Sequence, residues 1–255
     1  GPTGAFIPII YAIVVDYGVQ NLLVATMLAG AMLVAMGVFR IGNLIRFIPK
    51  TVVIGFTNGI AVVIFLAQIK DFLGLQVDHL PGEFFGKVKA LASHLDTLDP
   101  PTVALSVASL VVLLSWNRLA RRYPAVGRLP GPLGVLVLAT AANAILQLPV
   151  ETIGSRFNGI PQELPAIGLP ELSLATLGKL ISPALTIALL GAIESLLSAR
   201  VADSAIDDRH DPNQELIAQG LANLVAPLFG GFAATGAIAR TATNVRTGGR
   251  TPVAG

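Results

Sequence analysis

Two short stretches near opposite ends of the chain share residue types that could bind an anion. Each places a threonine and small residues beside a Gly or Pro break and just before a short apolar stretch. The residues are Thr3, Gly4, Ala5 and Phe6 in the first stretch and Thr235, Gly236, Ala237 and Ile238 in the second. A helix that begins there exposes unpaired backbone N–H groups and about half a positive charge. Two such starts facing each other predict an anion site that needs no buried cation.

The small residues also have a purely structural interpretation. Gly4, Ala5, Gly236 and Ala237 would let two helices cross closely inside a membrane. That interpretation accounts for the glycines, but it does not account for two interrupted helices that share three identical residues, Thr-Gly-Ala, at their starts.

Two ionisable residues lie close to these stretches or inside an apolar run. Arg240 follows the second helix start by about one turn. It either raises the positive potential at the site or extends toward the cytoplasmic surface with Arg246 and Arg250.

Glu194 is the one charged residue in the run 180–199. A carboxyl group at that depth must be protonated, bind a cation or pair with Arg240, and we favour a role in proton or cation coupling. Ser198, one helical turn away, is a second candidate ligand or simply bonds to the backbone.

The elements that position these residues are predicted to be membrane-spanning helices. The chain has 255 residues, of which 53% are hydrophobic and 13% are charged. Five runs contain no Asp, Glu, Lys or Arg: residues 17–39, 51–69, 100–117, 129–150 and 216–239. A helix of about 20 apolar residues crosses the hydrocarbon core, so the pattern indicates an all-α polytopic membrane protein. The net charge of +2 shows no basic patch for nucleic acid, and we find no catalytic motif and no metal-ligand spacing.

Two segments are predicted to be interrupted rather than continuous. The first starts at Gly1 and has only a short apolar stretch before a turn at residues 16–20. The second is the run 216–239, which contains Pro227, Gly230 and Gly231. Lipid does not tolerate broken helices unless they line a polar cavity, and paired broken segments mark the binding site of inverted-repeat transporters. The first half-helix would run outward and the second inward, so their starts would meet near mid-membrane.

The basic residues predict an orientation. Twelve of the 17 Lys and Arg residues fall in the connections 40–50, 118–128, 200–209 and the stretch from 240 onward, which we therefore place inside. Segment 81–98 reads as a short amphipathic helix on the outer surface, and segment 148–178 as an external loop.

The chain resembles the SulP (sulfate permease) family over its whole length. The resemblance is carried mainly by the runs 213–223, 227–232, 235–244 and 248–251, by 1–6, which is similar to the start of the family's third helix, and by 191–198, which is similar to its eighth. It implies fourteen segments in two inverted sevens, with two broken half-helices that hold the anion between them. This chain would run from the third helix to the start of the eleventh, without the terminal helices and the STAS domain.

The same resemblance implies two domains with different roles in transport. Residues 1–50 and 172–255 would form the substrate-carrying core domain, and residues 51–150 the gate domain against which it moves. Glu194 falls at the family's coupling position. Related bicarbonate carriers have Asp there with sodium, and they have Thr where this chain has Ser198 and Ile238. These departures favour H⁺ over Na⁺ as the coupling ion.

The resulting expectation is secondary active transport of sulfate, bicarbonate or dicarboxylate anions, coupled to protons, by a protein that is not an enzyme and has no cofactor. The alternative is an anion channel or exchanger of the same fold without cation coupling. The expected partners are a small anion, the lipid bilayer and a second copy in a homodimer. The expected location is the cell membrane, as a multi-pass protein of the bacterial inner membrane.

Overall fold

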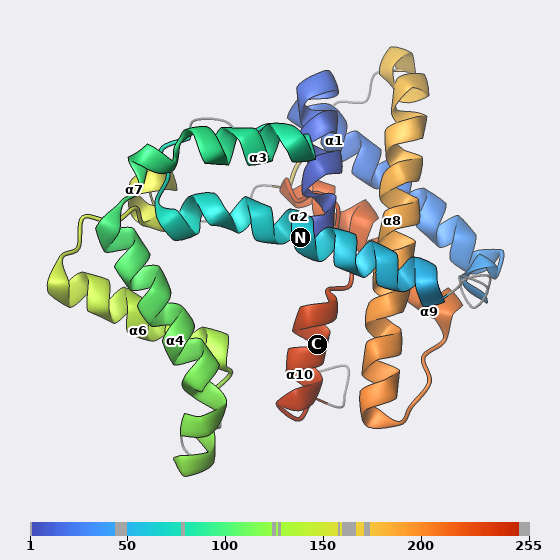
Figure 1. Cartoon of the computed structure of the whole chain (residues 1–255). Coiled ribbons are helices and arrows are strands. Elements are labelled where there is room, and N and C mark those ends of the chain that lie inside the picture. The colour runs from blue at the N-terminus through green and yellow to red at the C-terminus, as the bar shows by residue number, and fades with distance from the viewer. Residues whose placement is uncertain are drawn as a thin grey trace. The chain divides into compact units, whose positions relative to one another are not determined.

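The computed structural model describes residues 2–43, 50–77, 80–123, 126, 129–157, 159, 167–170 and 174–249. The regular elements within these residues are helical, and Figure 1 labels most of them. They are η1 (Gly4–Phe6), α1 (Ile7–Val38), α2 (Lys50–Leu73), α3 (Phe84–Ser93), η3 (Leu95–Thr97), α4 (Pro100–Arg122), α6 (Gly131–Leu146), α7 (Ile153–Phe157), α8 (Leu174–Ile206), α9 (Pro212–Val225), η4 (Ala226–Phe229) and α10 (Ile238–Arg246).

Three helical stretches of the described chain are long and apolar enough to cross a membrane. They cover Gly4–Val38, Pro100–Arg122 and Thr176–Ile206, and Gly131–Leu146 is a shorter apolar helix. Local signals explain where α4 begins and ends: Asp99 accepts a hydrogen bond from Thr102 N at its start, and Arg121 and Arg122 lie in its last turn.

The membrane orientation stays a prediction, because three of the basic residues on which it rests lie outside the described residues: Arg46, Arg128 and Arg250.

The first segment is predicted to be interrupted at Gly1 and Pro2, and Gly1 lies outside the described residues. Within α1 the structure has a break at Gly18. This residue has φ 82° and ψ 167° in the middle of α1, a conformation that glycine adopts without a steric penalty. It separates a short first part, residues 7–17, from a longer second part, residues 19–38. In Figure 1 the dark blue first part and the lighter blue second part of α1 run in different directions. The break falls within the turn predicted at residues 16–20.

The second predicted break follows α9. Pro227 lies in the short 3₁₀ turn η4, and Gly230 then takes φ 70°. Proline lacks the N–H that would continue the helix, so the chain leaves the helical path at this point. Residues 231–237 are non-helical, and α10 begins at Ile238. The run 216–239 is therefore interrupted, as its proline and glycines predict.

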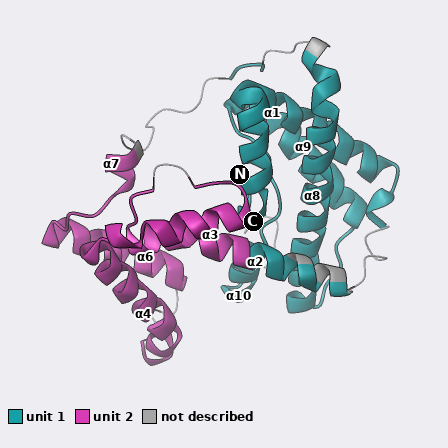
Figure 2. Ribbon diagram, turned by 45° about the horizontal axis from the view of Figure 1, so that its top comes forward, with its two compact units in different colours: residues 1–61, 164–255 teal, residues 62–163 magenta. Residues whose placement is uncertain are grey.

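The chain divides into two compact units, coloured separately in Figure 2. Unit 1 contains residues 1–61 and 164–255, and unit 2 contains residues 62–163. Helix α2 is shared between them. The assignment of residues 1–50 and 172–255 to a core domain and of 51–150 to a gate domain stays a prediction.

Unit 1 is built on close packing of α1 against α8 and α9. Leu33 of α1, Ile187 and Leu196 of α8, and Leu216 of α9 belong to one buried apolar cluster. The backbones of α1 and α9 come into contact where glycines face each other. A Cβ atom on Gly220 would lie 2.6 Å from Val34 N, and one on Gly30 would lie 2.7 Å from Gly220 O.

We expect Gly220→Ala to destabilise unit 1. The added methyl group would overlap backbone atoms of α1, and overpacking of this kind typically costs about 1–3 kcal/mol. Thermal unfolding of the purified protein in detergent measures the effect. Gly178→Ala in α8 is the matched control, because a Cβ there meets nothing within 4 Å. Equal melting temperatures for the two variants would contradict the close approach of α1 and α9.

Unit 2 differs from the prediction in segment 81–98. The helix ends at Ser93 and a separate 3₁₀ turn covers Leu95–Thr97. Lys87 is only 6% exposed, whereas Phe85 is 81% exposed. Lys87 lies four residues from the buried Leu91 and therefore on the same face of α3. The helical spacing of the apolar residues did not by itself identify the face of α3 that is buried in unit 2.

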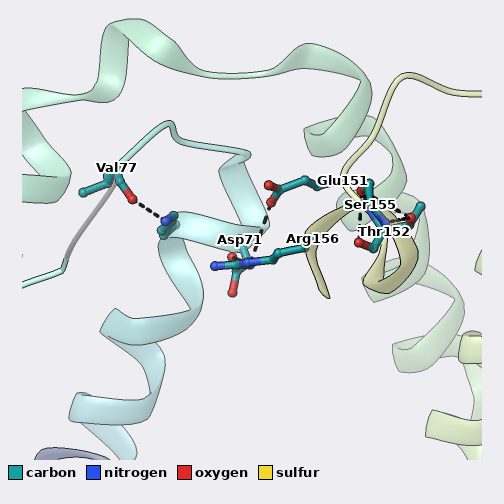
Figure 3. Close-up of polar contacts among 7 residues, drawn as sticks. Asp71, Val77, Glu151, Thr152, Ser155 and Arg156 are labelled. Atoms are coloured by element: carbon teal, nitrogen blue, oxygen red, sulfur yellow. Dashed lines mark hydrogen bonds and ion pairs between the residues drawn. The ribbon is translucent and has the colours of Figure 1, made fainter. Parts of the chain in front are cut away.

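An ion pair fixes the short helix α7 within unit 2. Arg156 Nη1 lies 2.9 Å from Asp71 Oδ1 at the end of α2 and 3.8 Å from Glu151 Oε2. Figure 3 shows the three side chains. The hydrogen bond to Asp71 raises the pKa of Arg156. These side chains line a cavity of about 720 Å³ together with Lys70 and Thr102. Because Arg156 and Asp71 are well exposed, the pair contributes little stability and mainly sets geometry.

Candidate functional site: two half-helix starts beside helix α8

The two predicted helix starts lie beside the same turn of α8. Thr3 Oγ1 donates a hydrogen bond to Glu194 Oε2 at 2.6 Å. The next residue, Ser195, has its Oγ 3.2 Å from Thr235 Oγ1 and accepts a hydrogen bond from Gly236 N at 3.0 Å. The structure thus brings Thr3 and Thr235 to adjacent residues of one helix. Figure 1 shows the first part of α1 and the helix α10 running away from this region in opposite directions.

Both helix starts are free of side-chain caps. The capping residues are Thr3 for η1, Phe6 for α1 and Ala237 for α10, and none of them makes a side-chain cap hydrogen bond. None of these elements has an acidic residue in its first turn. By contrast, α4 and α9 begin at Asp99 and Asp211, which do accept capping bonds. The two half-helix starts therefore lack the side-chain caps that would compete with an external anion for their first N–H groups.

The small residues of the two stretches have different surroundings. Gly4 and Ala5 are half-buried within η1, and Phe6 is completely buried in the apolar cluster of unit 1. Ala237 and Ile238 are half-buried. A Cβ on Gly236 would lie 3.0 Å from Ser195 Cα, so this glycine also serves close packing against α8. The structural interpretation of the small residues thus holds at Gly236.

Glu194 is buried beside the first helix start. Its side chain is 5% exposed and is bonded to Thr3. Arg240, the cation proposed as its partner, is exposed and forms no ion pair among the described residues. Ser198 is also buried, and its Oγ lies 2.7 Å from Thr241 Oγ1 on α10. Glu194 and Ser198 therefore contact the two half-helices from a single face of α8.

Three polar residues that sequence reasoning did not single out also hold this region. Thr26, Ser195 and Asn223 are each at most 1% exposed, and each bonds to the backbone between residues 233 and 236. Their one sequence signal is a polar residue on an otherwise apolar helix, which is too common to be decisive.

The family model described as "Sulfate permease family" matches residues 1–255 of the chain. The chain belongs to the sulfate permease family. The predicted resemblance is confirmed, and so is the fold class of an all-α, multi-pass membrane protein with broken half-helices.

Two curated relatives show how far the similarity extends. YvdB of Bacillus subtilis (strain 168) is 45% identical over 257 residues, which cover 100% of this chain and 47% of that protein. The bicarbonate transporter BicA of Synechocystis sp. (strain ATCC 27184 / PCC 6803 / Kazusa) is 30% identical over 246 residues, covering 94% of this chain and 41% of BicA. The chain thus spans about half the length of these relatives or less.

A solved structure of the family agrees with the fold. The transmembrane domain of a cyanobacterial bicarbonate transporter BicA superposes with a TM-score of 0.80 at 29% identity, covering 99% of this chain and 64% of that chain. The family and its named relatives are transporters and not enzymes, as the sequence analysis expects.

Proposed function

We propose that this protein carries out secondary active transport of small anions of the sulfate, bicarbonate or dicarboxylate class, coupled to protons. The observation that carries the proposal is the meeting of two uncapped half-helix starts at Glu194 and Ser195. Membership of the sulfate permease family supports the transport of anions.

The anion site would be made mainly of backbone N–H groups. Each helix start offers about half a positive charge, and in a low-dielectric environment this attracts an anion far more strongly than it would in water. Thr3 and Thr235 would contribute hydroxyl groups, and Arg240 would add positive potential from the first turn of α10. Gly4, Ala5, Gly236, Ala237 and Ile238 would form the immediate surface of the site, and Phe6, which is buried in the apolar cluster, would anchor the first helix start.

The position of Glu194 supports the proposed proton coupling. Its carboxyl group already accepts the Thr3 hydrogen bond, so an ionised Glu194 would compete with the substrate for the same donor and would repel it. Protonation would remove the repulsion, and a proton and an anion would then load together. Sodium coupling is less favoured because Ser198, the second candidate ligand, already pairs with Thr241.

The site residues all belong to unit 1, so we propose that unit 1 carries the substrate and that unit 2 contributes the gate. The remaining proposals are a location in the bacterial inner membrane and assembly as a homodimer.

Uptake of labelled sulfate, bicarbonate and succinate by purified protein in proteoliposomes tests the function. We expect accumulation of at least one of these anions when an inward proton gradient is imposed, and no stimulation by a sodium gradient alone. Currents far above carrier turnover would indicate a channel instead. Uptake driven only by a counter-anion would indicate an exchanger without proton coupling.

A further inference from the structure

The non-helical segment 231–237 is held by side chains from three different helices. Ala233 N donates to Thr26 Oγ1 of α1 at 3.4 Å, and Ala234 N donates to Asn223 Oδ1 of α9 at 2.8 Å. Gly236 N donates to Ser195 Oγ of α8 at 3.0 Å. Inside a membrane, backbone groups without helical partners must be satisfied by the protein itself. The path of this segment therefore depends on these side chains.

Asn223 makes two hydrogen bonds to the backbone of this segment, whereas Thr26 and Ser195 make one each. Its Oδ1 accepts from Ala234 N, and its Nδ2 donates to Ala234 O and Gln219 O, all at 2.8 Å. A side-chain amide has two N–H donors and one oxygen, so every polar atom of Asn223 is engaged. The bond to Gln219 fixes the amide on α9, and the two bonds to Ala234 fix the backbone on both sides of that residue.

Ala234 lies three residues before Ala237, the residue that precedes the uncapped start of α10. Residue 233, just before it, is buried and has φ 20°, outside the regions that alanine prefers. Its conformation must be imposed by its surroundings. A side chain that holds residue 234 thus sets the direction in which the first N–H groups of α10 point.

We propose that Asn223 is a positioning residue for anion binding, acting through Ala234 to aim the start of α10 at the anion. This inference rests on the proposed function. Asn223 lies on α9 and reaches the site through the backbone of residues 234–237, so its effect on affinity is indirect.

Two variants test the inference. Asn223→Leu keeps the approximate size of the side chain and removes every hydrogen bond to Ala234. Ser195→Ala removes the acceptor for Gly236 N with a smaller change of volume. Asn21→Leu is the matched control, because Asn21 Nδ2 also donates to a carbonyl four residues earlier, Tyr17 O, but has no hydrogen bond to residues 231–237.

The measurement is the dissociation constant for sulfate and for bicarbonate, expressed per mole of folded protein, together with the melting temperature. Leaving buried partners unpaired changes an equilibrium constant by about tenfold or more. We expect the dissociation constant to rise by about tenfold in Asn223→Leu and by a smaller factor in Ser195→Ala. The Asn21→Leu control should stay within about twofold of the wild type, as expected for a change outside the site.

The outcomes separate this inference from the proposed function. Wild-type protein that binds and transports none of sulfate, bicarbonate and succinate would overturn both. Wild-type protein that binds, with both variants binding equally tightly despite a lower melting temperature, would overturn the positioning role alone and assign Asn223 a purely structural one. If Asn223→Leu does not fold, the affinity of Ser195→Ala decides the question.

Discussion

Ala237→Asp should abolish anion transport while leaving the protein at least as stable as the wild type. Ala237 precedes α10 with φ −113° and ψ 109°, the extended conformation in which an aspartate caps a helix. The new carboxylate would accept hydrogen bonds from the first N–H groups of α10 and place a negative charge where the substrate binds. A cap of this kind adds about 0.5–2 kcal/mol of helix stability. We expect initial uptake rates per folded protein to fall by about a hundredfold or more, as when a charge-stabilising group is lost.

Ala237→Asn is the matched control for this substitution. Asparagine caps a helix about as well as aspartate but brings no charge. It should therefore reduce uptake much less than aspartate, with a similar melting temperature. If the Ala237→Asp protein is fully folded and takes up the anion at the wild-type rate, the start of α10 does not bind the substrate.

Glu194→Gln should remove the response of uptake to an imposed proton gradient. Glutamine retains an oxygen that can accept the Thr3 hydrogen bond, so the geometry of the first helix start should be preserved. It cannot gain or lose a proton. Wild-type uptake is expected to rise as the external pH is lowered, whereas uptake by the variant should be independent of pH. Sulfate binding should be partly retained, because a neutral side chain no longer repels the anion.

Glu215→Gln is the control for this experiment. Glu215 is a half-buried acid on α9, outside the hydrogen-bond network that links the two helix starts. Its replacement should leave pH-driven uptake unchanged. A Glu194→Gln protein whose uptake still follows external pH like the wild type would exclude Glu194 as the proton carrier.

The breaks in the helices could be predicted from the sequence because glycine and proline act locally. Pro227 and Gly230 end α9 through their own backbone geometry, and Gly18 has a positive φ within the turn predicted at residues 16–20. The uncapped start of α10 agrees with its sequence, because Ala237 precedes Ile238 whereas Asp211 precedes α9.

The network that supports the second start could not be predicted in the same way. Thr26, Ser195 and Asn223 lie in apolar helices, where Ser, Thr and Asn commonly bond to the carbonyl four residues earlier. Thr26 does this as well, with Leu22 O, while also accepting from a residue 207 positions away. Only the packing of α1, α8 and α9 around the segment reveals that the three side chains bond to the same stretch of backbone, residues 233–236.

The burial of Lys87 could not be predicted from the spacing of apolar residues. Segment 81–98 was predicted to be an amphipathic helix on the outer surface, and several of its apolar residues, including Phe85 and Val88, are exposed in unit 2. In a membrane protein an apolar side chain can face lipid as readily as a protein core, so hydrophobic periodicity does not distinguish the two.

The location of a bound anion tests the central claim most directly. Selenate, an anion of the shape and charge of sulfate, can be located by its anomalous scattering in crystals of the purified protein. The account predicts a single strong peak within hydrogen-bonding distance of the backbone N–H groups at the starts of both half-helices, close to Thr3 and Thr235. A peak elsewhere in a protein that transports sulfate, with this position empty, would contradict it.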